Sequence, residues 1–118
     1  MHIIVYNPYC SDAVEDSRKV IGMLIERFGA AAVKFHSRSR LTIDIFDTRI
    51  DFWHGELCKM AGVNPDYYVA WNINAVEFLE CAASRVNGKR LGSLDDIGRV
   101  IFEHYRAVTE VSSGHEEA

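Results

Sequence analysis

Cys10 is the first residue of the sequence whose position suggests chemistry. It follows a short apolar segment, residues 3–6, and stands near the start of a predicted helix. Free N–H groups and the dipole at a helix N-terminus favour the thiolate, which is the reactive form of cysteine. A thiol-dependent enzyme that uses Cys10 is therefore one function the sequence allows, and an inert loop cysteine is the alternative.

The residues around Cys10 carry a partial resemblance that bears on this hypothesis. Asn7-Pro8-Tyr9-Cys10, followed by Ser17-Arg18, is similar to the Asn-Pro-x-Cys-x-x-Ser-Arg site of glutaredoxin-like arsenate reductases. The resemblance implies a reductase-like enzyme. The chain departs from the pattern because the spacing from Cys10 to Arg18 is too long and acidic residues intervene. These are Asp12, Glu15 and Asp16.

A second candidate for chemistry is His54-Gly55-Glu56, which is similar to the His-x-Glu of zinc deaminases. In that family the histidine binds zinc and the glutamate moves protons. A deaminase also needs Pro-Cys-x-x-Cys, whereas Cys81 is followed by Ala-Ala-Ser and offers one thiol. We therefore expect a polar loop here, with no metal site and no cofactor.

A group of basic residues is the clearest surface feature. Apolar and polar residues alternate over residues 33–46, so an extended chain would carry the basic side chains on one face. Such a patch contacts phosphates or an acidic protein surface. The alternative is a solvated strand face, paired locally with Asp44 and Asp51. The basic group comprises Lys34, His36, Arg38, Arg40 and Arg49.

Aromatic residues suggest a protein-binding surface, because Trp and Tyr commonly anchor protein interfaces. Tyr67 and Tyr68 are neighbours on one predicted strand, so they point to opposite faces and cannot both enter one core. We add Trp53, Tyr67 and Trp71 to the candidate binding residues and expect core packing for most other aromatic residues.

Hydrophobic periods and turn residues predict the elements that position these side chains. Asp47-Thr48 is expected to link residues 45–46 to the next strand as a hairpin. The last helix is expected to bury Tyr105. The predicted strands are residues 3–6, two stretches within 33–46, 49–52 and 67–71. The predicted helices are residues 12–28, 56–61, 74–86 and 94–105.

These elements predict an α/β fold with a small two-layer or three-layer sheet, a central β-hairpin and C-terminal helices. The 118 residues fit one domain over residues 1–111, followed by a disordered polar tail at 112–118. The net charge of −4 gives no general attraction to nucleic acid, so binding would require a local patch.

Cysteine use and hydropathy indicate the cytoplasm and no membrane contact. The three cysteines, Cys10, Cys58 and Cys81, are scattered and odd in number, which disfavours a disulfide framework. We find no apolar run of 18 residues, and the segment after Met1 lacks the pattern of a signal peptide.

Residues 41–72 carry a second resemblance. The segment contains two alternating strands, a stretch with a Gly that changes from polar to apolar residues, and a third strand that ends at Trp71-Asn72. This order resembles the part of terminase or helicase P-loop ATPases that leads into their metal-binding pair of acidic residues. The resemblance covers residues 3–72 and implies a P-loop-like fold. Its Walker motifs are missing: the loop at residues 7–17 has no Gly and no Lys, and Trp71-Asn72 replaces two carboxylates.

A P-loop-like order of elements without its catalytic residues suggests a non-enzymatic binding protein whose partner is another protein. By analogy, we expect a small phage-type accessory or inhibitor protein that binds a host complex, such as defence or nucleic-acid machinery. Two alternatives stay open. One is the thiol enzyme that uses Cys10, and the other is a nucleic-acid-binding module that uses Arg38, Arg40 and Arg49.

Overall fold

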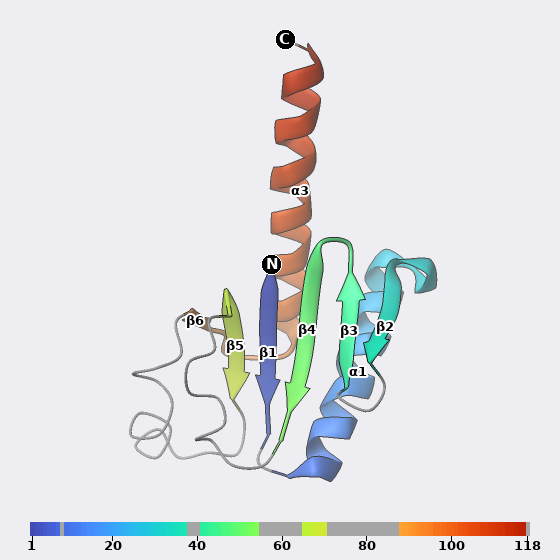
Figure 1. Ribbon diagram of the computed structural model, residues 1–118, viewed down its shortest axis with the longest axis vertical. Helices are drawn as coiled ribbons and strands as arrows, with labels where there is room; N and C mark the ends of the chain where they lie inside the picture. The colour runs from blue at the N-terminus through green and yellow to red at the C-terminus, as the bar shows by residue number, and fades with distance from the viewer. Residues whose placement is uncertain (8, 38–40, 55–64, 71–87, 118) are drawn as a thin grey trace.

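The fold is α/β, as predicted, with a six-stranded mixed sheet and a long C-terminal helix (Figure 1). The computed structural model describes residues 1–7, 9–37, 41–54, 65–70 and 88–117. The predicted helices at 56–61 and 74–86 lie outside these residues. Neither described helix combines the length and the apolar character that crossing a membrane requires.

The sheet has the strand order β2-β3-β4-β1-β5-β6. β1 is parallel to both β4 and β5, and β5 is parallel to β6, whereas β2, β3 and β4 form an antiparallel meander. The strands are β1 (His2–Tyr6), β2 (Val33–Ser37), β3 (Thr42–Ile45), β4 (Thr48–Trp53), β5 (Tyr67–Ala70) and β6 (Lys89–Arg90). The helices are α1 (Cys10–Phe28), the 3-10 turn η1 (Ala30–Ala32) and α3 (Asp95–Glu117).

The predicted hairpin is formed by β3 and β4, with a two-residue turn. The turn residues are Phe46 and Asp47, one position earlier than the predicted Asp47-Thr48 link, because Thr48 already pairs with Ile45. Phe46 has a φ of +53°, which matches the left-handed backbone that two-residue hairpin turns require. The turn therefore places an aromatic side chain at the tip of the hairpin.

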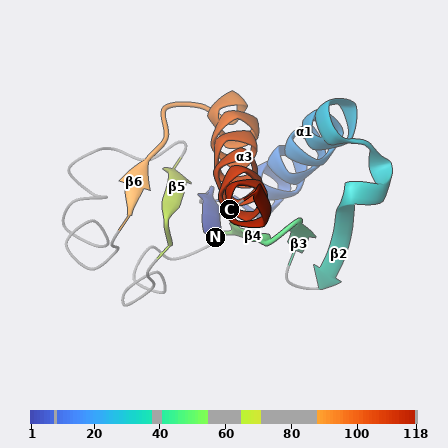
Figure 2. The same ribbon diagram turned by 90° about the horizontal axis from the view of Figure 1, so that it is seen from above.

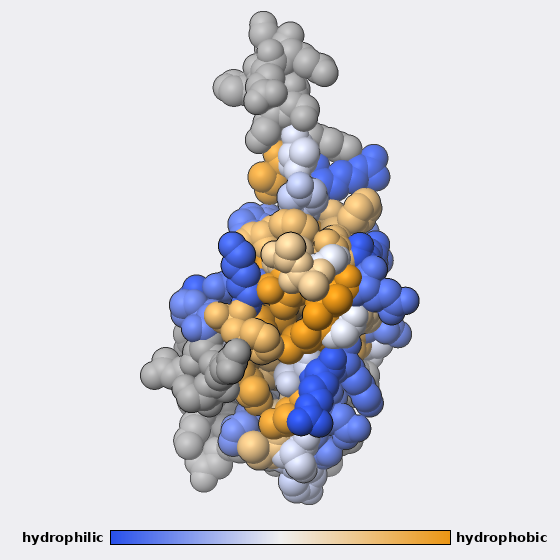
Figure 3. All heavy atoms as spheres, turned by 90° about the vertical axis from the view of Figure 1, so that its right-hand side faces the viewer, coloured by the Kyte–Doolittle hydropathy of each residue, from blue (hydrophilic) through white to orange (hydrophobic). Residues whose placement is uncertain are grey.

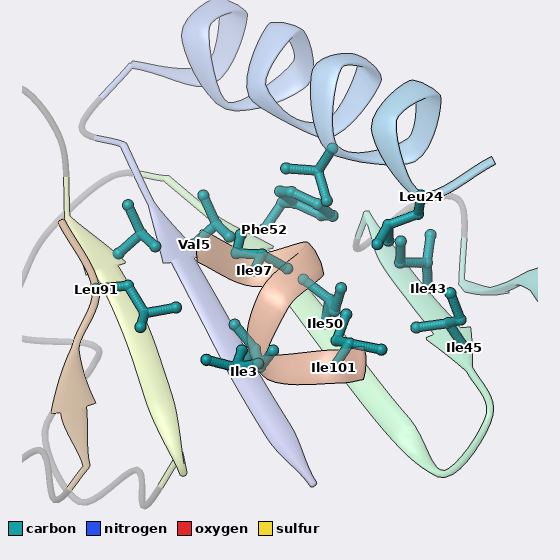
Figure 4. Packing of buried hydrophobic residues seen from close by; sticks show 13 residues of the cluster. Ile3, Val5, Leu24, Ile43, Ile45, Ile50, Phe52, Leu91, Ile97 and Ile101 are labelled. Carbon is teal, nitrogen blue, oxygen red and sulfur yellow. The ribbon is translucent and has the colours of Figure 1, made fainter. Parts of the chain in front are cut away.

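Both described helices pack on one face of the sheet, which we call the helix face (Figure 2). Alternate residues of β1 and β4 point to this face, including Ile3, Val5, Ile50 and Phe52 (Figure 4). They meet Leu24 of α1 and the N-terminal part of α3. The remaining members of the core cluster are Val20, Ile43, Ile45, Val69, Leu91, Ile97, Val100 and Ile101.

One prediction of burial was wrong, and one apolar strand residue is unexpectedly exposed. Phe35 is in register with the buried Ile43, but its side chain is 57% exposed. It lies on β2, at the edge of the sheet and beside an irregularity in the β2–β3 register. Tyr105 was expected in the core, but it is 42% exposed because it packs on the hairpin turn. Its helix continues to Glu117 and extends beyond the strands (Figure 1).

Thr48→Val is expected to raise the free energy of unfolding by about 1 kcal/mol. Thr48 is 2% exposed, and its hydroxyl has no hydrogen-bond partner among the described residues. Valine keeps the shape and removes the cost of burying that hydroxyl. Urea denaturation measures the change, with Thr42→Val as the control because the Thr42 hydroxyl donates to Asp51 at 2.6 Å. Lower stability for Thr48→Val would contradict this expectation.

Candidate functional site

The predicted basic group is only partly within the described residues, and two of its three described members, His36 and Arg49, are paired with Asp44. Lys34, His36 and Arg49 share the face opposite the helices, while Arg38 and Arg40 lie outside the described residues. Arg49 Nε donates to Asp44 Oδ1 at 2.9 Å, and His36 Nδ1 lies 3.4 Å from Asp44 Oδ2. The hydrogen bond from Arg49 lowers the pKa of Asp44. The described part of this face is therefore not a free cationic patch.

The same face carries a network centred on Asp51. Its Oδ2 lies 2.5 Å from His2 Nε2, and its Oδ1 accepts a hydrogen bond from Thr42 Oγ1 at 2.6 Å. A carboxylate that orients an imidazole is a common part of acid–base sites. Among the described contacts of Asp51 there is one hydroxyl, that of Thr42. It donates to the Asp51 carboxylate and not to His2. The arrangement joins three strands, and among the described residues His2 contacts no hydroxyl or thiol through this network.

Cys10 is exposed and is the first residue of α1. The polar groups beside it hold the connection between β1 and α1. Asn7 Nδ2 donates to Asp16 Oδ2 at 3.2 Å, and the backbone N–H of Tyr9 donates to Asn7 Oδ1 at 3.3 Å. Asn7 and Asp16 are both buried, so these contacts stabilise the connection. The described residues contain no group of three or more His, Cys, Asp or Glu side chains placed to hold a metal ion.

Asp16→Asn is expected to stabilise the fold at neutral pH, by about 0.5–2 kcal/mol. Burial raises the pKa of Asp16, so the fold disfavours its ionised form. This cost is complete above the pKa of the folded state and disappears as the pH falls through it. The gain in the free energy of unfolding over wild type, measured by urea denaturation, should therefore shrink between pH 7 and about pH 4.

Glu26→Gln, an exposed change on the same helix, is the control. An unchanged gain at both pH values would contradict the account.

Exposed aromatic side chains gather where α1 ends, the hairpin turns and α3 passes. Phe46, Phe102 and Tyr105 are 43%, 40% and 42% exposed, respectively. The rings of Phe46 and Tyr105 stack with centroids 4.3 Å apart, and Phe28 meets Phe46 edge-on at 5.5 Å. Figure 3 shows apolar side chains gathered on one side of the molecule. We call Phe28, Phe46, Phe102 and Tyr105 the aromatic patch.

The aromatic patch has the Arg27 cation at one end and a histidine–carboxylate pair at the other. The Arg27 guanidinium lies 5.1 Å from the ring centroid of Phe102 and 5.7 Å from that of Phe28. At the other end, next to Phe46, Asp47 Oδ2 lies 2.8 Å from His104 Nε2. The hydrogen bond from His104 is the main cause that lowers the pKa of Asp47. The patch is therefore an apolar row that has a cation at one end and, at the other, a carboxylate paired with His104 and close to the N-terminal ammonium, which donates to the Asp47 carbonyl oxygen at 2.9 Å.

The other predicted aromatic binding residues are not part of this patch. Trp53 is half-buried at the end of β4, in register with Tyr6 and opposite the helices. Tyr67 is half-buried against the core on the helix face. Trp71 lies outside the described residues. In the sequence, the patch had one usable signal, which was an aromatic residue at a hairpin turn.

No protein-family model, curated protein or solved structure matches this chain. The resemblance to a P-loop ATPase without Walker motifs therefore stays a prediction.

Proposed function

We propose that this protein acts without catalysis, by binding another protein through the aromatic patch. The observation that supports this function is the stacking of exposed rings contributed by the hairpin turn and α3. Exposed rings that already hold one another lose little freedom on binding, and aromatic residues often supply most of the energy of an interface. Core side chains of the same elements fix the position of the patch.

The two alternative functions have weaker support. Cys10 is exposed, which is compatible with a thiol enzyme, and loss of a measured activity in Cys10→Ser would favour that function. A nucleic-acid-binding module would rely on Arg38 and Arg40, because Arg49 is paired with Asp44. A phage-type accessory or inhibitor role is the narrower form of the proposed function and stays a prediction.

Affinity capture from the source cells tests the proposed function. The bait is the full chain, compared with a Phe46→Ser/Tyr105→Ser double variant and with Tyr9→Ser. Tyr9 is 63% exposed but lies at the opposite end of α1 from Phe28, so it controls for the loss of an exposed aromatic residue. We expect partners to bind wild type and Tyr9→Ser and to be lost from the double variant. Equal capture by all three baits would overturn the proposed function.

A further inference from the structure

We draw no further inference here: the strongest candidate, the aromatic patch formed where the end of α1, the β3–β4 turn and α3 meet, carries none because nothing in the described residues shows what covers it.

Discussion

Phe52→Ala is expected to lower the free energy of unfolding by about 3–5 kcal/mol. Phe52 is 2% exposed and lies on β4, an interior strand of the sheet. It points to the helix face, in register with Val5 of β1. Removing the ring leaves a cavity between sheet and helices that rigid neighbours can fill only partly. A domain of this size has a total stability of about 5–15 kcal/mol, so the loss would be a large part of that stability.

Urea denaturation followed by circular dichroism measures this loss. Phe35→Ala is the matched control, because it removes the same ring from a position that is 57% exposed. The control should change stability by less than about 1 kcal/mol. A value for Phe52→Ala within about 1 kcal/mol of wild type would contradict the described core.

Asp51→Ala is expected to cost about 1–3 kcal/mol, the second largest effect. The carboxylate joins three strands by accepting from Thr42 and contacting His2. Thr42 is 3% exposed, so its hydroxyl would lose its partner in a place that water reaches poorly. Leaving a buried donor unpaired costs more free energy than its hydrogen bond contributes to stability. Removal of the Asp51 carboxylate, which is the acceptor, is therefore expected to destabilise the fold.

The same denaturation experiment on Asp44→Ala provides the comparison. Asp44 also accepts from a basic side chain on this face, but its partner Arg49 is exposed. Exposed ion pairs contribute about 0–1 kcal/mol, so the loss should be small. An equal or larger loss for Asp44→Ala would show that Asp51 is not the centre of the network.

The local elements were predictable because they follow from residue periods and turns. The apolar residues of β1, the apolar face of α1 and the β3–β4 hairpin all belong to continuous stretches of sequence. Strand order was not predictable in the same way. The pairing of β1 with β4 joins residues such as His2 and Asp51, which are far apart in the chain, so the Asp51 network had no sequence signal.

The aromatic patch was missed for a related reason. Its side chains come from the end of α1, the hairpin turn and the middle of α3, and only the fold brings these segments together. The period of α3 placed Tyr105 on the buried side of the helix, but α3 extends beyond the strands (Figure 1). Tyr105 instead meets Phe46 at the turn, where both rings stay partly exposed.

Photo-crosslinking at position 46 tests the central claim, that the aromatic patch is covered by protein. Phe46 is replaced by photo-reactive benzoylphenylalanine, and Tyr9 is replaced in the same way as the control. After irradiation in the source cells, we expect protein adducts from position 46, and mass spectrometry then identifies them as a second copy or another protein. Position 9 should give few adducts. Equal adducts from both positions, or none from position 46, would contradict a docking surface at the patch.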